Sequence, residues 1–72
     1  MFEPQGIRQL RERRGMPLAE LARRADLARG TLYAAESGQP SRLDTLVRIA
    51  RELEVSLAEI SPDAARAVEA VA

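Results

Sequence analysis

Apolar residues recur at helical spacing through most of the chain, and between Pro17 and Glu36 two short patterns of this kind meet. The first places apolar residues on one face of an amphipathic helix; they are Leu18, Leu21, Ala22 and Ala25. The second pattern resumes on a new phase at Ala28, Leu32 and Ala35. We therefore predict two short helices joined by a tight turn over residues 17–36, the second helix covering residues 28–36.

The turn carries two signals of its own. Asp26 stands where a chain reversing between helices needs a left-handed residue, a conformation that Asp adopts more readily than most residues. Leu27 follows and is expected to fill the turn from the core side. Helices this short are unstable alone in water, so a scaffold must bury one face of each. A helix over about residues 5–14, ended by Gly15, is predicted as part of that scaffold.

The strongest apolar stripe follows these two helices. Ser41 and Asp44 have the spacing of a capping box, which predicts a fourth helix running to about Leu53. With Ile49 the apolar surface of this helix is wider than one core face requires. Ser56 repeats the capping signal and starts a short fifth helix that holds Leu57 and Ile60.

The tail, residues 61–72, begins with a further helix start, Ser61-Pro62-Asp63, and continues as an Ala-rich stretch. Both a short sixth helix and a frayed end are compatible with it. No repeat or linker divides the chain, so residues 1–72 are predicted to form one all-α domain.

Composition narrows the function. The 72 residues include neither Cys nor His, which removes disulfides, the usual metal sites and most nucleophile and base pairs. We therefore expect no enzyme activity, no small-molecule substrate, no cofactor and no bound metal. No apolar run approaches the roughly 20 residues that span a bilayer, and no signal peptide is recognisable. A soluble, cytoplasmic protein without a membrane partner is the prediction.

The charges cancel over the whole chain but not within its halves. Eleven Arg balance eleven acidic residues, and the pI of about 6.2 is lower than that of a typical nucleic-acid binder. Residues 1–36 nevertheless hold seven Arg against five acidic residues, and residues 37–72 hold four against six. Every basic residue is Arg, which suits bidentate contacts to phosphate or guanine. A genome rich in G and C is the alternative explanation for that usage.

Residues 7–60 resemble the Cro and phage-repressor type of helix-turn-helix protein, the XRE family. The matching positions are Arg11, Gly15, Leu21-Ala22, Ala25, Leu27, Thr31-Leu32, Glu36, Gly38, Ile49-Ala50 and Leu53-Glu54-Val55. The resemblance implies a five-helix repressor-like domain, to which the tail adds the possible sixth helix. It also implies a structural pair, and not a catalytic one, between Arg11 of the first helix and Glu36 at the end of the third.

In that family the third helix lies in the major groove of double-stranded DNA. The resemblance assigns base contacts to four outward positions, Arg29, Gly30, Tyr33 and Ala34. A guanidinium can donate two hydrogen bonds to guanine, so Arg29 is the favoured reader of sequence; a phosphate contact or a solvated side chain is the alternative. Further residues are candidates for phosphate contacts, with solvated charge as the alternative for the Arg residues: Thr31, Arg13, Arg14, Arg23 and Arg42.

The chain also departs from the family pattern. Pro17 and Leu18 stand where a polar cap and a Gln commonly bind phosphate, Ala28 replaces a Ser cap, and Ala35 replaces a bulky residue. These changes, with Asp26 for a turn Gly, leave the third helix poor in large contacting side chains. We expect modest DNA affinity from each copy.

The predicted function is a sequence-specific transcriptional regulator that binds a near-palindromic operator as a homodimer. A dimer interface is predicted from apolar residues outside the first core face; they are Ile49, Val55, Leu57, Ile60 and Val68. The alternative for each is that it completes a small core. The alternative function is a helical protein-interaction module, antitoxin-like or polymerase-contacting, with a protein partner and weak DNA binding.

Overall fold

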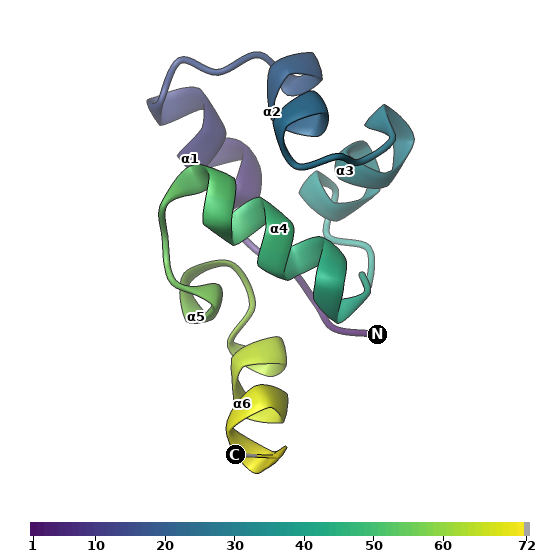
Figure 1. The fold of residues 1–72 in the computed structure, drawn as a ribbon, viewed down its shortest axis with the longest axis vertical. Helices are drawn as coiled ribbons and strands as arrows, with labels where there is room; N and C mark the ends of the chain where they lie inside the picture. Colours follow the sequence, from purple (N-terminus) through teal and green to yellow (C-terminus); the bar gives the residue numbers. More distant parts are fainter. Residues whose placement is uncertain (72) are drawn as a thin grey trace.

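The fold is described from a computed structural model, which covers residues 1–71. Within these residues the chain forms six helices: α1 (Ile7–Arg13), α2 (Leu18–Arg24), α3 (Arg29–Glu36), α4 (Leu43–Leu53), α5 (Leu57–Ile60) and α6 (Pro62–Val71). In residues 1–71 the one element of β structure is an isolated antiparallel bridge between Phe2 and Ser41. Figure 1 shows α1, α2 and α3 on one side of α4, and α5 and α6 on its other side, with α6 at the far end of the long axis. The predicted all-α, repressor-like fold is confirmed.

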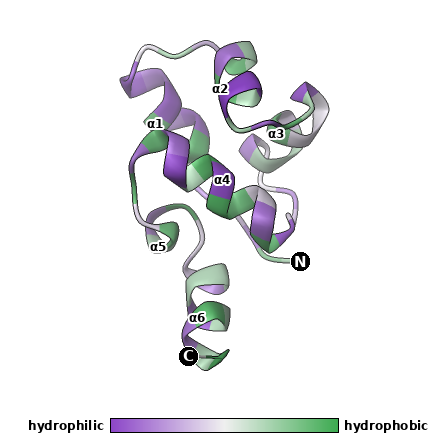
Figure 2. Ribbon diagram, viewed as in Figure 1, coloured by the Kyte–Doolittle hydropathy of each residue, from purple (hydrophilic) through white to green (hydrophobic). Residues whose placement is uncertain are grey.

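The core forms around α4, an amphipathic helix that carries both hydrophobic and hydrophilic residues (Figure 2). Leu46, Ile49 and Leu53 on its inner face are fully buried, together with Leu21 of α2 and Leu32 of α3. Ile49 is therefore part of the core of this chain, and no surface of its side chain is left for a partner. The wide apolar face of α4 was interpreted as part of a dimer interface. It is instead buried inside the domain, because other helices cover α4 on more than one side.

The turn between α2 and α3 has the predicted conformation. Asp26 adopts the left-handed region, with φ of 57°, and the backbone N–H of Leu27 donates to the carbonyl of Ala22 at 2.8 Å. Arg48 of α4 also donates to the carbonyl of Asp26 at 3.2 Å. Leu27 is half-buried against the core. Ala28, assigned to the inner face from its spacing, is instead exposed, because it is the N-cap of α3 and its backbone is extended.

The predicted capping boxes are largely absent. Arg42, and not Ser41, is the N-cap of α4; the buried Ser41 hydroxyl instead donates to the carbonyl of Gln39 at 3.1 Å. Ser56 is the N-cap of α5, but its side chain forms no cap hydrogen bond. In contrast, the hydroxyl of Ser61 accepts from the N–H of Ala64 at 3.1 Å and caps α6, with Pro62 at the first helical position. The tail is thus helical over Pro62–Val71.

The segment before α1 links distant parts of the chain. Phe2 and Ser41 exchange two backbone hydrogen bonds of 2.8 Å, and the N–H of Gln5 donates to the carbonyl of Ile60 at 2.7 Å. The hydroxyl of Ser61 donates to the carbonyl of Glu3 at 2.8 Å. These bonds keep the chain extended up to Gly6, whose positive φ of 66° turns it into α1, so this helix starts later than the predicted position near residue 5.

The helices of residues 1–71 are short. No helix in this part of the chain is long and apolar enough to cross a membrane. In the same residues, no group of three or more acidic residues, His or Cys is arranged to hold a metal ion.

Candidate nucleic-acid interface

A buried ion pair fixes the end of α3. Nε of Arg11 donates to Oε2 of Glu36 at 2.5 Å, and Nη2 donates to Oε1 at 3.1 Å. The third guanidinium nitrogen, Nη1, donates to the carbonyl of Met16 at 2.8 Å. The Glu36 side chain is 0% exposed and that of Arg11 is 11% exposed. The hydrogen bonds to Glu36 raise the pKa of Arg11, against the opposing effect of burial. The pair implied by the resemblance is present and holds α3 against α1.

With Leu32 and Ala35 buried, the opposite side of α3 is left to solvent. Its middle line consists of the small residues Gly30, Ala34 and Ser37, at positions i, i+4 and i+7. The longer predicted contact residues flank this line, and Tyr33 is 59% exposed and outside the core. The four residues predicted to contact bases are therefore brought together on one helix face, but large side chains stand only along its margins.

One margin of α3 faces α2. Arg29 and Arg23 lie beside the same hollow of about 360 Å³, whose other lining residues include Ala22 and Leu27. Both Arg side chains are exposed. Two guanidinium groups next to an apolar surface suit a phosphate and a base edge of the same DNA strand.

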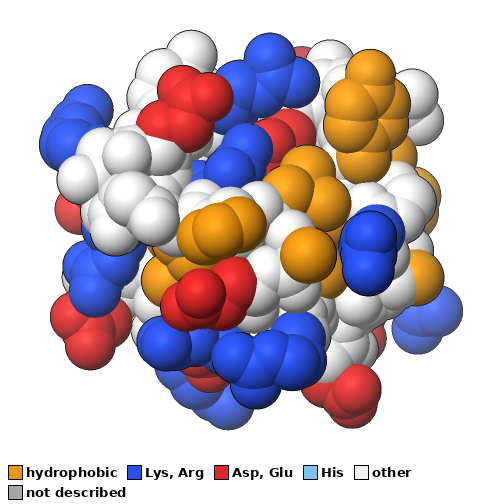
Figure 3. Space-filling model, turned by 90° about the horizontal axis from the view of Figure 1, so that it is seen from above, with side chains coloured by type: hydrophobic (Ala, Val, Ile, Leu, Met, Phe, Trp, Pro, Cys, Tyr) orange, Lys and Arg blue, Asp and Glu red, His pale blue; other side chains and the backbone are white. Residues whose placement is uncertain are grey.

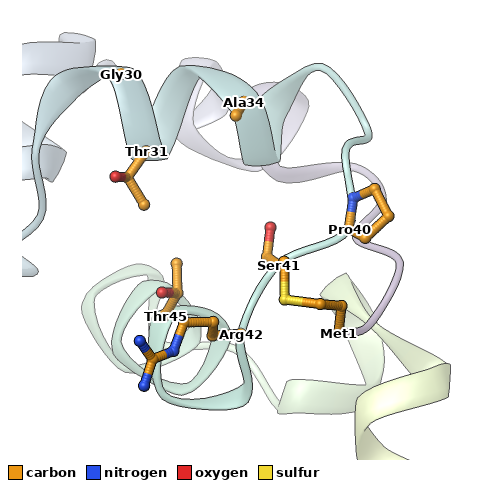
Figure 4. A pocket seen from close by; sticks show the side chains of 8 residues that line it. All are labelled: Met1, Gly30, Thr31, Ala34, Pro40, Ser41, Arg42 and Thr45. Atoms are coloured by element: carbon orange, nitrogen blue, oxygen red, sulfur yellow. The ribbon is translucent and has the colours of Figure 1, made fainter.

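The other margin faces the start of α4 across a pocket of about 350 Å³. In Figure 4, the side chains of Thr31 and Thr45 point toward one another across the pocket, and Gly30 and Ala34 lie along the α3 wall. Arg42, the N-cap of α4, also lines it, and its side chain forms an exposed ion pair with Asp44 at 3.4 Å. Thr31 and Arg42 are thus brought together, although they were assigned to phosphate independently.

The distribution of ion pairs leaves free positive charge near α2 and α3. Seven of the eleven Arg residues lie within 4.0 Å of a carboxylate, counted over residues 1–71. Four form no such pair in this part of the chain: Arg13, Arg23, Arg29 and Arg51. Figure 3 shows basic, acidic and apolar groups interspersed on the end of the molecule that carries α2 and α3.

Arg14 is placed differently from the other predicted phosphate contacts. Its Nη1 donates to the carbonyl of Leu53 at 3.1 Å, and its Nη2 lies 3.0 Å from Oε1 of Glu54. The guanidinium therefore binds the C-terminal end of α4, where the partial negative charge of a helix favours a cation. Its side chain is 41% exposed, so the assignment of Arg14 to a phosphate stays a prediction.

The predicted interface residues fall into two groups. Ile49 and Ile60 are fully buried, so for these two residues the core alternative describes their side chains. Val55 and Leu57 are half-buried against the core, and Val68 on α6 is 40% exposed. Val68 and the exposed Val71 share a face of α6 with the buried Ala64. The apolar face of α6 therefore continues past the part that the domain covers.

Sequence reasoning did not identify Thr45, which is buried near the start of α4 and lines the pocket beside α3. The available signal was a polar residue inside an apolar helical stripe. It also did not separate the middle line of α3 from its margins, although a helical wheel of residues 29–37 contains that information.

Comparison with known proteins shows similarity to one protein family and to solved structures. A model of the helix-turn-helix family matches residues 7–60. The solved structure of a complex of the SinR protein and the SinI protein contains a chain that is 29% identical to this one, with a TM-score of 0.69. The match covers 74% of this chain and 53% of that one, so the present chain spans about half the length of that protein. A search of curated proteins returned no match.

Proposed function

Because the chain belongs to the helix-turn-helix family of DNA-binding regulators, and to its XRE type, we propose that it controls transcription by binding a specific sequence of double-stranded DNA. The observation that carries this proposal is the exposed face of α3, held by the Arg11–Glu36 pair and flanked by the free guanidinium of Arg29. A helix presented in this way enters the major groove, which is wide enough to admit it.

Within the groove, each margin of α3 has a distinct role. Arg29 donates two hydrogen bonds to a guanine, and Tyr33 contacts a neighbouring base or phosphate. Gly30 and Ala34 let base edges approach the helix backbone. Arg23, next to Arg29, binds the phosphates on the α2 side, while Thr31 and Arg42 bind them on the α4 side. The unpaired Arg13 adds a further phosphate contact. The lining of the two hollows supports the grouping of Arg23 with Arg29 and of Thr31 with Arg42.

The regulator acts as a homodimer that places two α3 helices about 34 Å apart on a near-palindromic operator. A single copy has few long side chains on α3, so binding through two copies supplies the affinity that one lacks. The surface for this contact comprises Val55, Leu57 and Val68, the members of the predicted interface that remain at least partly accessible. The surface proposed for the dimer contact is thus separate from the face of α3 proposed to bind DNA.

Selection from a random pool of double-stranded DNA, followed by titration at several salt concentrations, tests the function. The expected result is an enriched sequence with two related half-sites, bound with an affinity that falls steeply as salt rises. Binding that is weaker than micromolar to every sequence, or that is independent of salt, overturns the proposal.

A second candidate is a protein-interaction module that keeps the same fold. The exposed continuation of the apolar face of α6 favours it, as does the fact that the similar structure is a complex of two different proteins. The same selection experiment separates the two functions, since a module of this kind yields no enriched DNA sequence and retains its binding to the partner at high salt.

A further inference from the structure

The first three residues, here called the N-terminal segment, join two corners of the domain that are distant in the sequence. Phe2 exchanges two backbone hydrogen bonds of 2.8 Å with Ser41, at the corner between α3 and α4. Glu3 uses both of its backbone groups at the start of α6. Its carbonyl accepts from the Ser61 hydroxyl at 2.8 Å, and its N–H donates to Oδ2 of Asp63 at 3.4 Å. One peptide bond therefore separates the contact with one corner from the contact with the other.

The corner between α3 and α4 belongs to the proposed DNA face. Ser41 directly precedes Arg42, the N-cap of α4, and both residues line the pocket beside α3 together with Thr31. Met1 lines the same pocket from the N-terminal segment (Figure 4). Thr31 and Arg42 are the two residues proposed to bind phosphates on this side of α3. The N-terminal segment thus holds the stretch of backbone from which the Arg42 side chain extends.

At the start of α6, a single hydroxyl has two roles. The Ser61 side chain is fully buried, and its hydroxyl donates to Glu3 while it accepts from the N–H of Ala64 at 3.1 Å. The cap of α6 and the anchor of the N-terminal segment therefore share one oxygen atom, so opening of the first turn of α6 weakens the anchor as well. The N–H of Gln5 is bound independently, to the carbonyl of Ile60 in α5. Residues 1–3 are thus the part of the chain that depends on α6.

Helix α6 has little cover from the rest of the domain. It packs mainly against α5 and lies at the far end of the long axis (Figure 1). Residues 68–71 are exposed, and the exposed fraction of Val71 is 87%. A helix of ten residues with so few contacts is marginally stable in water, and elements of this kind open without unfolding of the whole domain. Helix α6 with its N-terminal segment can therefore exist in a docked form and an open form.

We propose that the N-terminal segment couples α6 to the DNA face. While α6 is folded, the segment is docked and holds Arg42 in position for its phosphate; when α6 opens, this support is lost. The inference rests on the proposed function and adds a means of regulation to it. By linkage, folding of α6 and binding of DNA stabilise each other. The proposed dimer contact includes Val68 of α6, so association of two copies favours the docked segment and raises the DNA affinity of each copy.

Titration of the full chain with its selected operator at several salt concentrations tests the coupling. Ser61→Ala should lower the DNA affinity about fivefold or more, under conditions in which circular dichroism shows a folded domain. The slope of log affinity against log salt should fall by up to about 0.9 per bound copy, because the phosphate contact of Arg42 weakens. A domain that is only less stable keeps its slope. Combined with Arg42→Ala, the Ser61 substitution should change the slope no further. Ser56→Ala removes a hydroxyl without a cap bond and is the matched control, with affinity and slope unchanged.

Hydrogen exchange in the unaltered chain gives a test that does not depend on the folding of a variant. Operator DNA should slow exchange of the N–H groups of Ala64 and Ala65, both of which donate to Ser61. The factor should exceed that for the N–H of Glu59 in α5. Equal slowing in the two helices overturns this inference alone, as does a folded Ser61→Ala variant that keeps the salt slope of the wild type. Failure to select any DNA overturns the proposed function together with it.

Discussion

At the scale of single residues, the Arg11–Glu36 pair links a pattern in the sequence to the position of α3. It was implied by family resemblance, and its geometry is bidentate with the carboxylate fully buried. A buried carboxylate of this kind depends on its partner, because water cannot replace the lost hydrogen bonds. The pair therefore determines where the exposed face of α3 stands relative to the rest of the domain.

Replacing Arg11 by Ala should lower the free energy of unfolding by about 3–5 kcal/mol, since Glu36 would remain buried with only the half-exposed Arg8, whose Nε lies 3.5 Å from Oε1, as a partner. Urea denaturation monitored by circular dichroism measures the loss. Arg66→Ala is the control, because its ion pair with Asp63 is exposed and should contribute less than about 1 kcal/mol. Equal losses for the two variants would contradict the structural role assigned to the buried pair.

The prediction about recognition of a DNA base concerns Arg29. Arg29→Ala should cost about 1–3 kcal/mol per half-site and relax the preference at one base pair, because the bidentate contact to guanine is lost. Binding assays on operators with each base substituted measure this directly. Arg51→Ala removes another guanidinium that forms no ion pair within residues 1–71; it lies near the C-terminal end of α4, away from α3, and should leave the preference unchanged. A uniform loss across all sequences would show that Arg29 contacts phosphate only.

At the scale of elements, the first residues of the helices show that a capping signal in the sequence does not always produce a capping hydrogen bond. Three Ser residues stood at predicted helix starts, and one of them, Ser61, forms the capping hydrogen bond. Ser41 is instead drawn into the bridge with Phe2, and Ser56 caps without its side chain. Local spacing shows that a hydroxyl is available, but contacts from distant segments decide how it is used.

Ser61→Ala should destabilise the domain by about 1–3 kcal/mol, because the hydroxyl is fully buried, caps α6 and donates to the carbonyl of Glu3. Thermal unfolding of the variant provides the measurement. The matched control is Ser56→Ala at the start of α5, which removes a hydroxyl without a cap bond and should change stability by a few tenths of a kcal/mol. A larger effect at Ser56 than at Ser61 would refute the role of the α6 cap.

The start of α3 offers a gain in stability. Ala28 is its N-cap, has an extended backbone and provides no side-chain hydrogen bond. Ala28→Ser should therefore raise the free energy of unfolding by about 1 kcal/mol. The same substitution inside α2, Ala19→Ser, serves as a control and should lower stability slightly, because Ser is a poorer helix former than Ala. A thermal midpoint for Ala28→Ser at or below that of the wild type would contradict the expected cap.

At the scale of the whole molecule, DNA binding depends on few free charges. The net charge is zero, and most Arg residues lie close to carboxylates, so the proposed DNA contacts draw on Arg23 and Arg29, which form no ion pair within residues 1–71. The opposite end of the long axis carries α6, whose apolar face continues beyond the covered part. The proposed DNA-binding face and the exposed apolar face of α6 therefore lie at separate ends of the domain.

Salt dependence can count the copies bound to one operator. Loss of one phosphate contact lowers the slope of log affinity against log salt by about 0.9. Arg23→Ala should thus lower the slope by about 0.9 if one copy binds and by about 1.8 if two copies bind, and we expect the larger change. Titrations from low to moderate salt give both slopes. Ala58→Gly on α5 is a control that leaves the charges intact, and a change of about 0.9 for Arg23→Ala would contradict the homodimer.

The sequence by itself determined the helices, the left-handed Asp26 and the resemblance that implied the Arg11–Glu36 pair, because helical periodicity, backbone preferences and spacing along one chain are local properties. Only the tertiary structure decided which faces are covered. Ile49 entered the core, Arg14 turned to the end of α4, and Thr45 came to line a pocket beside α3. Each of these placements depends on a segment far away in the chain, and such contacts leave no periodic signal in the sequence.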